Sequence, residues 1–409
     1  MLLPRGHHLA YCANIHRGET WPETLVALEQ HTLAVRARVC PGRPFAIGLR
    51  LGDLASRQLA EPSALLHFQR WLGRHDCYVF TINGFPFGRF HGERVKERVY
   101  LPDWTSPERL EYTNRLFDLL AQLLPPGVAG SVSTVPGSFK EFIAAPEQLA
   151  AIRGHLHACV KHIAKTAARS RRALHLGLEP EPLCLLETAR ETADFFDRLR
   201  DEYPGDSRLE EFLGVNYDTC HLAVEFEEAA QALALLQSRR VKISKIHLSN
   251  ALKVRFADGP PAVLSSAGPA KEEGPAKAGG LAAFADGTYL HQVVTRNAAG
   301  QLTRYRDLDD FLNPQSVPMN RDNPPWEEAR VHFHIPLHTP PADWFGTTSD
   351  HLLGVLDALQ AAPNLCSHLE METYTWEVLP PEWKSRSVAD QLAAEYQWCL
   401  RELRRRGLA

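Results

Sequence analysis

Short apolar or β-branched runs recur along the chain, and each is followed by a longer stretch with apolar residues three and four positions apart. Such runs are typical of buried strands, and the longer stretches are typical of amphipathic helices. We predict strands at residues 8–15, 44–51, 77–84, 130–135, 173–181, 212–219, 243–249 and 366–373. Strands that alternate with helices form parallel βαβ units, and eight such units close most simply into a barrel. The sequence therefore predicts the α/β class and a (β/α)8 TIM barrel, and it lacks the G-x-G-x-x-G motif that would favour the alternative, a doubly wound open sheet.

The interval between the seventh and eighth predicted strands departs from this regular alternation, because it is far longer than the other intervals. Within it, residues 257–280 are rich in Ala, Gly and Pro without an apolar period, and we expect them to be flexible. Residues 287–308 predict a hairpin around Asn-Ala-Ala-Gly. An insertion after a barrel strand lies on the face where barrels carry their chemistry. We interpret residues 1–409 as one barrel domain and residues 255–345 as an insertion that serves as a lid or specificity element.

Composition and charge narrow the possible partners. The chain of 409 residues has 44% apolar and 23% charged residues and a net charge of −4, with Lys and Arg spread along its length. This balance predicts a sizeable core and gives no electrostatic basis for binding nucleic acid or a membrane. No apolar run approaches the length of a membrane span, and the first residues lack the apolar core of a signal peptide. We therefore expect a cytoplasmic protein whose eight dispersed cysteines are reduced.

The ends of the last four predicted strands carry a cluster of polar residues. In a barrel, residues at the carboxyl ends of different strands converge on one pocket. These ends supply Glu179 and Glu181, Asp218 and His221, His247, and Glu370 and Glu372. Carboxylates and imidazoles without thiolates are typical ligands of a divalent ion such as Mn²⁺, Mg²⁺, Co²⁺ or Zn²⁺. We therefore expect Asp218 and His221 to face a metal site.

The two glutamate pairs leave a choice of ligand open, because the period of two points both members of each pair to the same side of the strand. We prefer Glu179, at the end of its apolar run, and Glu372, as the more C-terminal residue of its pair. Glu181 and Glu370 remain alternatives. Taken singly, each carboxylate could be a salt-bridged residue of the rim and each histidine could be a hydrogen-bonded core residue. The occurrence of all these residues at one rim favours the metal site.

These strand ends resemble the xylose isomerase-like TIM-barrel superfamily, which includes sugar-phosphate isomerases and epimerases and the endonuclease IV DNA-repair enzymes. With "ANIHRGETW", "FTINGFPFG", "RVYLPDW", "STVPGSFK", "LEPEPLCLLET" and "YDTCHLAVEFE", the chain resembles the EboE family, described as metabolite-traffic proteins of that superfamily. The resemblance implies one divalent metal ion with ligands at Glu179, Asp218, His247 and Glu372. His221 lies beside them as a ligand or a substrate contact.

The implied activity is a divalent-metal-dependent isomerase or epimerase of a sugar or cyclitol, which acts by proton transfer through a metal-stabilised enediolate. Glu179 and Glu372 are the implied base and acid. The residues expected to contact the substrate are His221, Arg330, His332, His334, His16, Asn83, Glu181, Glu370 and Lys140. For the histidines of the "RVHFHIPLH" segment, the alternative to substrate contact is that they simply face solvent.

Two other functions remain open. The first is a zinc-dependent phosphodiesterase resembling endonuclease IV, which would need further histidines from the second and third strands, and "AIGLRLG" and "FTINGFPFG" contain none. The second is a non-catalytic metabolite-binding or traffic protein, against which an intact acid and base argue. The family's association with biosynthetic gene clusters favours a small polyol, sugar or cyclitol as the partner.

Overall fold

The computed structural model describes residues 1–256, 280–313, 326–342, 344–384 and 386–409. Its main sheet has eight parallel strands in the order β1-β13-β7-β6-β5-β4-β3-β2. They are β1 (His8–Tyr11), β2 (Phe45–Arg50), β3 (Cys77–Asn83), β4 (Gly130–Thr134), β5 (Leu174–Leu178), β6 (Leu213–Asp218), β7 (Lys242–Leu248) and β13 (His368–Met371). A parallel bridge between Cys12 and Gly48 joins the two edges. The predicted barrel is therefore confirmed, with each strand inside or overlapping its predicted range.

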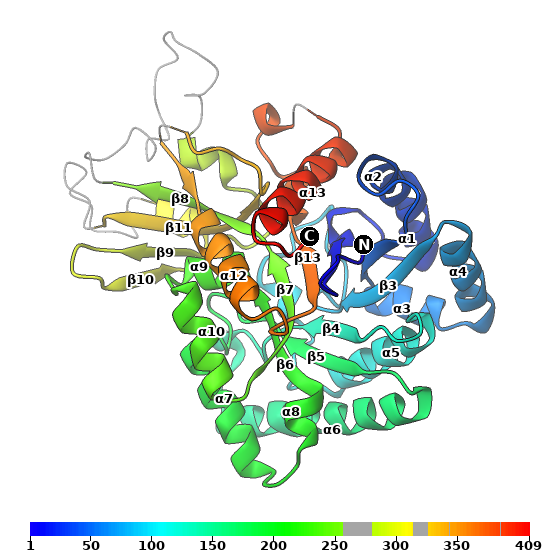
Figure 1. Ribbon diagram of the computed structural model, residues 1–409. Coiled ribbons are helices and arrows are strands. Elements are labelled where there is room, and N and C mark those ends of the chain that lie inside the picture. Colours follow the sequence, from blue (N-terminus) through cyan, green and yellow to red (C-terminus); the bar gives the residue numbers. More distant parts are fainter. Residues whose placement is uncertain (257–279, 314–325, 343, 385) are drawn as a thin grey trace.

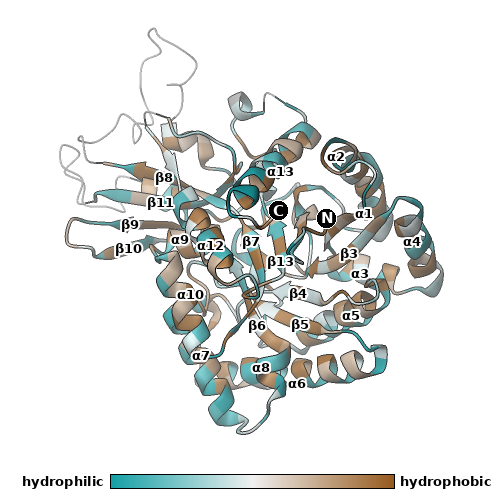
Figure 2. Cartoon of the chain, viewed as in Figure 1, coloured by the Kyte–Doolittle hydropathy of each residue, from teal (hydrophilic) through white to brown (hydrophobic). Residues whose placement is uncertain are grey.

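Helices surround the barrel (Figure 1). They are α1 (Trp21–Ala27), α2 (Leu33–Val39), α3 (Asp53–Leu59), α4 (Pro62–Arg74), α5 (Pro107–Leu123), α6 (Pro146–Ser170), α7 (Ala189–Glu202), α8 (Arg208–Phe212), α9 (Thr219–Val224), α10 (Ala229–Ser238), α12 (Ser349–Ala361) and α13 (Val388–Arg405). Helix α7 buries Ala189, Thr192, Ala193, Phe196 and Leu199, which is the spacing of an amphipathic helix. Figure 2 shows the resulting alternation of hydrophilic and hydrophobic residues along α6 and α7. None of the helices in the described ranges combines the length and hydropathy of a membrane span.

A second, antiparallel sheet follows β7 and lies beside the barrel (Figure 1). Its order is β10-β9-β11-β8-β12, with β8 (Asn250–Arg255), β9 (Val293–Arg296), β10 (Leu302–Tyr305), β11 (Glu328–Ile335) and β12 (Gly346–Thr347), and the short helix α11 (Leu308–Leu312) follows β10. Strands β9 and β10 form the predicted hairpin. The stretch predicted to be flexible, 257–280, lies outside the described residues apart from Gly280. The sheet has its own apolar cluster, which includes Leu252, Phe284 and Phe333.

Helix α9 connects the two sheets. It follows β6 directly and contacts β7 of the barrel as well as β8 and β11 of the second sheet. Asp218 is both the last residue of β6 and the N-cap of α9, and its side chain accepts hydrogen bonds from the amides of Cys220 and His221. This cap is the local reason that a carboxylate stands at the end of a buried strand. It also places His221, one turn later, next to that carboxylate.

Candidate metal centre

Four side chains from the ends of adjacent strands meet at one buried point. His247 Nδ1 lies 3.1 Å from Glu179 Oε1, 3.4 Å from Asp218 Oδ2 and 2.9 Å from Glu372 Oε2. The four donor atoms all lie within 4.8 Å of one another. The structure thus brings together the four residues that the sequence predicts as metal ligands, and it places neither Glu181 nor Glu370 in this group of four.

Strand register explains the convergence. Asp218 is paired with His247 across β6 and β7, and the amide of Glu372 donates to the Leu248 carbonyl at the end of β7. Asp218 Oδ1 accepts from the Cys220 and His221 amides and from Ser249 Oγ. Its second oxygen, Oδ2, is buried without a hydrogen-bond partner among the described residues, as is Glu179 Oε2. Buried carboxylate oxygens without a hydrogen-bond partner are candidate donors for a cation.

The second nitrogen of His247 is held by Glu370. His247 Nε2 lies 2.9 Å from Glu370 Oε2, and Lys245 Nζ pairs with the same oxygen. The side chains of all three residues are fully buried. Because Nε2 faces Glu370, Nδ1 is the nitrogen that faces the other carboxylates, and a carboxylate behind one ring nitrogen is the usual arrangement for a metal-ligating histidine. Glu370, predicted as an alternative ligand and a substrate contact, instead lies behind His247 and orients it.

The electrostatics of the centre favour a bound cation. Burial opposes a charge on His247, but the carboxylates of Glu372 and Glu179 outweigh burial and raise the pKa of His247 well above its ordinary value. Burial likewise opposes the charge on Asp218, yet His221 and His247 hold the pKa of that carboxyl well below its ordinary value. Three carboxylates thus surround one imidazole in a buried space. This donor set of oxygen and imidazole nitrogen fits a divalent ion.

A cavity opens onto this centre. Glu179 and Glu372 form part of its lining, and aromatic walls are supplied by Phe85, Phe90, Tyr100, Tyr289 and Tyr374. A largely aromatic lining with a few polar groups is typical of a site for a small molecule.

Four of the predicted substrate contacts also line the cavity: Asn83, Glu181, His221 and His332. His334 contacts His221 and His332, with its Nε2 3.4 Å and 3.3 Å from theirs. Glu181 accepts a hydrogen bond from the Tyr100 hydroxyl at 2.7 Å, and burial together with the charge of Glu179 raises the pKa of Glu181 well above its ordinary value.

The structure does not bring Arg330, Lys140 and His16 to the cavity lining. Arg330 pairs with Glu328 at 2.7 Å and lies over the ring of Phe226. Lys140 pairs with Glu187, just before α7, and with Glu191 in the first turn of that helix. His16 bonds to the Tyr11 hydroxyl and stacks on His31. Each of these three side chains is bonded to a neighbour that its own motif does not reveal. The expectation that they contact a substrate in the cavity is therefore corrected.

Several cavity residues were not predicted. Asn14 donates to Glu372 Oε1 at 2.6 Å, and its position just after the first strand is the sequence signal that marks it as a candidate for the strand-end rim. Tyr100 comes from a connecting segment without a periodic pattern, and Tyr289 lies in the stretch predicted as a hairpin, where nothing marks it as a cavity residue. His91 bonds to both the Tyr289 hydroxyl and the Asn14 carbonyl, so it positions two of these residues.

The fold and the site define a (β/α)8 barrel with a candidate divalent-metal centre at the carboxyl ends of its strands. No family model and no curated protein sequence matches the chain, and membership of the EboE family stays a prediction. Solved structures similar to it include an L-ribulose 3-epimerase (12% identity, TM-score 0.48, 98% of this chain and 95% of that one). Others are the IolI protein with a bound zinc atom (11%, 0.47, 97% and 98%) and the probable 3-DHS dehydratase AsbF, involved in petrobactin synthesis, from Bacillus anthracis (12%, 0.47, 96% and 98%).

Proposed function

We propose that this protein is a divalent-metal-dependent isomerase or epimerase that moves a proton at the carbon next to the carbonyl of a sugar or cyclitol. One observation carries the proposal: Glu179 and Glu372, which follow β5 and β13, reach the same buried point and line the same cavity. Strands β6 and β7 separate β5 from β13, so the two carboxylates approach that point from different directions. Removal and return of a proton from two sides requires such a pair.

The four converging side chains would hold the ion: Glu179, Asp218, His247 and Glu372. When bound, a divalent ion supplies Lewis-acid polarisation of a carbonyl, which acidifies the neighbouring C–H. Glu370 keeps His247 in the orientation that presents Nδ1. Lys245 in turn holds Glu370 ionised: burial opposes that charge, but Lys245 and His247 lower the pKa of Glu370 to about 2.

The surroundings of the two glutamates give them different roles. Glu372 Oε1 accepts from the side-chain amides of Asn14 and Asn83, at 2.6 Å and 3.2 Å, which leaves Oε2 directed at the centre. Glu179 Oε2 has no hydrogen-bond partner among the described residues and is therefore available to accept a proton. We assign removal of the proton to Glu179 and its return to Glu372. Return to the same carbon gives epimerisation, and return to the former carbonyl carbon gives isomerisation.

The cavity wall supports an unphosphorylated polyol as the substrate. Among the described residues that line the cavity, Lys96 is the cationic one, and its ammonium pairs with Asp307 at 2.6 Å. A phosphate group would therefore meet no available cation in this lining. The aromatic walls instead suit the C–H faces of a sugar or cyclitol ring, while Asn83 and Glu181 offer hydrogen bonds to hydroxyl groups.

Deuterium exchange tests this function directly. Protein loaded with Mn²⁺, Co²⁺ or Zn²⁺ is incubated with a panel of ketoses and keto-cyclitols in D₂O, and NMR follows the carbon next to the carbonyl. We expect exchange with at least one compound, and a loss of about 10²–10⁴-fold in Glu179→Gln and in Glu372→Gln. Glu225→Gln is the matched control, because Glu225 is equally buried but pairs with Arg304 outside the cavity lining.

Unchanged exchange in both cavity variants would remove these glutamates from the reaction. Saturable binding of a polyol without any exchange would instead support the metabolite-binding alternative. The phosphodiesterase alternative gains no support at the ends of β2 and β3, which are Arg50, paired with Glu19, and Asn83.

A further inference from the structure

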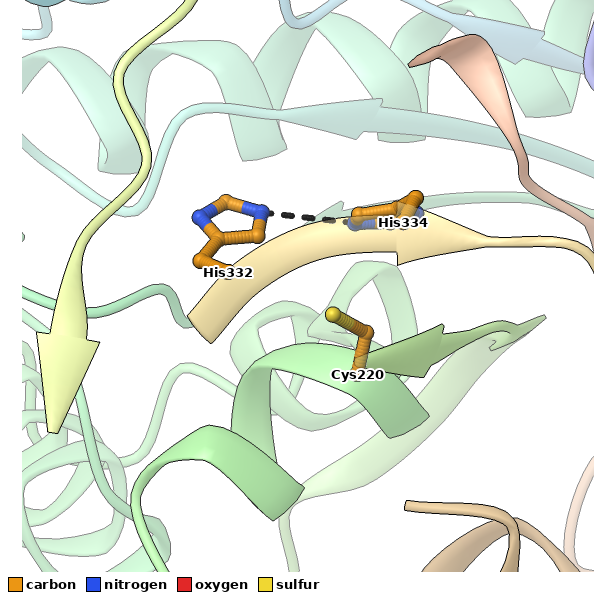
Figure 3. A group of neighbouring side chains, drawn as sticks. All are labelled: Cys220, His332 and His334. Atoms are coloured by element: carbon orange, nitrogen blue, oxygen red, sulfur yellow. Dashed lines mark hydrogen bonds between the residues drawn. The ribbon is translucent and has the colours of Figure 1, made fainter. Parts of the chain in front are cut away.

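The cavity that opens onto the metal centre is polar in the part next to that centre. Carboxylates and imidazoles line this part: Glu179, Glu181, His221, His332 and Glu372. Figure 3 shows His332 on β11 beside His334, with Cys220 of α9 close to both. The second sheet thus adds an imidazole to the same part of the lining. A sugar or cyclitol ring held at the centre would find its hydrogen-bonding partners here.

Another part of the lining, which we call the apolar wall, is almost free of polar side-chain atoms. Its aliphatic and aromatic members include Phe85, Pro86, Phe90, Val95, Val99 and Leu290. Tyr289 and Tyr374 complete the wall, and their ring centroids lie 5.1 Å and 5.4 Å from that of Phe90. These three rings form one cluster, with Val99 packed against it.

Two buried arginines bind the backbone of the loop that follows β3 and carries part of this wall. Arg109 Nη1 donates to the carbonyls of Gly84 and Phe85, at 2.9 Å each. Arg50 Nη2 donates to the carbonyl of Gly88 at 2.9 Å. These carbonyl oxygens are therefore engaged by protein donors, and the loop offers the cavity its apolar side chains.

Two polar side chains at the wall are also engaged. His91 Nε2 donates to the Asn14 carbonyl at 2.5 Å, so Nδ1 of the neutral ring accepts from the Tyr289 hydroxyl at 2.6 Å. The ring is neutral because burial lowers the pKa of His91 to about 4. Lys96 directs its ammonium at Asp307, at 2.6 Å. The hydroxyl proton of Tyr289 and the charge of Lys96 are thus already taken up within the protein.

The engaged polar groups limit what the apolar wall can accept. A polyol ring can present one C–H face to an aromatic ring, but its rim carries hydroxyl groups in several directions. A hydroxyl group that leaves water without gaining a hydrogen-bond partner is disfavoured. Apolar surface that leaves water for such a wall is favoured. The wall therefore suits a hydrocarbon group better than further hydroxyl groups.

We propose that the substrate carries an alkyl or aryl substituent, which lies against the apolar wall while the polyol ring lies at the metal centre. This inference rests on the proposed function and narrows its substrate class from free sugars and cyclitols to their alkyl or aryl derivatives. Three separate segments supply the ring cluster of the wall: Phe90 follows β3, Tyr289 precedes β9, and Tyr374 follows β13. The fold thus brings distant parts of the chain together to form one apolar surface beside the centre.

A pair of glucosides tests this inference without requiring turnover. Methyl and phenyl β-D-glucopyranoside present the same polyol ring and differ only in the substituent. Isothermal titration calorimetry on Zn²⁺-loaded protein measures the dissociation constant of each compound. We expect the phenyl compound to bind at least about 10-fold more tightly than the methyl compound. Equal affinities, or no binding of the phenyl compound, would overturn the inference.

Two phenylalanines of one loop form a matched pair of variants. Phe90 lines the cavity, whereas the Phe87 ring lies outside the lining and packs on Tyr112, with centroids 5.0 Å apart. Phe90→Ala should reduce the preference for the phenyl compound to about 3-fold or less, and Phe87→Ala should keep the wild-type preference. Val99→Thr is a milder variant, because it exchanges one methyl group for a hydroxyl group. It should reduce the preference by about 2–5-fold.

The outcomes distinguish this inference from the proposed function. A phenyl preference that falls in Phe90→Ala and Val99→Thr but not in Phe87→Ala supports the inference, even where no compound exchanges deuterium and the isomerase alone fails. A phenyl preference that all three variants retain overturns the inference, because the substituent then binds elsewhere. Deuterium exchange of free ketoses with a higher kcat/KM than that of their O-phenyl derivatives also overturns it and leaves the isomerase standing.

Discussion

The barrel and the second sheet are stabilised in different ways. The barrel interior contains fully buried charges, with Lys245 and His247 both on Glu370, and Lys245 also donates to Ser133. The core of the second sheet is apolar and aromatic, with Leu252, Phe333 and others packed together. Buried charges orient one another but contribute little net stability, whereas apolar burial stabilises without fixing direction. The barrel interior is therefore suited to aiming ligands, and the second sheet is suited to holding β11 against them.

Removing one charge from the barrel should have the largest effect on stability. Lys245→Met leaves Glu370 buried with His247 as its remaining charged partner, and we expect the free energy of unfolding to fall by about 3–5 kcal/mol. Urea denaturation measures this change. The double variant Lys245→Met/Glu370→Gln should recover part of the loss, because it removes both charges. A single variant as stable as the wild type would contradict the contrast between the two regions.

Truncation in the second sheet should have the next largest effect. Leu252 of β8 is fully buried in the apolar cluster, and we expect Leu252→Ala to cost about 3 kcal/mol of unfolding free energy. Hydrogen exchange should show faster opening of β8 and β11 than of β6. Leu54→Ala is the control, since Leu54 is 50% exposed and its truncation should cost less than about 0.5 kcal/mol. Equal acceleration in β6 would show that the two regions unfold as one unit.

Glu395 of α13 joins the two regions, because it accepts from the Leu337 amide after β11 and from Thr373 after β13. Burial raises the pKa of Glu395 to about 7. The stability gained from a raised folded-state pKa is fully present below the unfolded value near 4.5 and is lost as pH rises through 7.

From about pH 5 to pH 8, we therefore expect the wild type to lose on the order of 2 kcal/mol relative to Glu395→Gln. Thermal and urea unfolding of both proteins at the two pH values measures this difference. The difference in unfolding free energy between the wild type and Glu395→Gln could instead stay constant between the two pH values or change in the opposite direction. Either result would show that Glu395 is already ionised in the folded protein at pH 5.

Two glycines should show the smallest effects, for different reasons. A Cβ on Gly48 of β2 would lie 1.8 Å from Glu370 Oε1 and 2.7 Å from the Tyr11 carbonyl oxygen, and Gly48→Ala should cost about 2 kcal/mol. Gly300, in the β9–β10 hairpin, has open space around it but a φ of +80°, so Gly300→Ala should cost about 1 kcal/mol through backbone strain alone. A larger cost at Gly300 than at Gly48 would mean that the Glu370 side chain moves away from the added methyl group more easily than its contacts with Lys245 and His247 suggest.

Much of the barrel could be predicted, because parallel strands buried on both faces leave continuous apolar runs in the sequence. The convergence of Glu179, Asp218, His247 and Glu372 could be predicted for a related reason: each stands at the end of such a run. Choosing Glu372 over Glu370 was harder, since both point to the same side of the strand. The structure separates them by depth, with Glu370 beside Lys245 inside the barrel and Glu372 at its mouth.

Partners distant in the chain were beyond prediction. Asn14 and Glu372, which are hydrogen-bonded, are 358 residues apart, and no local pattern relates them. A nearby partner was missed as well: Arg330 was expected at the cavity, but it pairs with Glu328, two residues before it on β11.

The sequence by itself determined the strand–helix alternation, and with it the barrel and the rim where four polar strand ends meet, because burial and periodicity are local properties of the chain. Only the tertiary structure decided which of those side chains face one another and that β11 brings His332 and His334 against His221. Distances between donor atoms depend on strand register and on the packing of a second sheet, and neither is encoded in the spacing of residues along the chain.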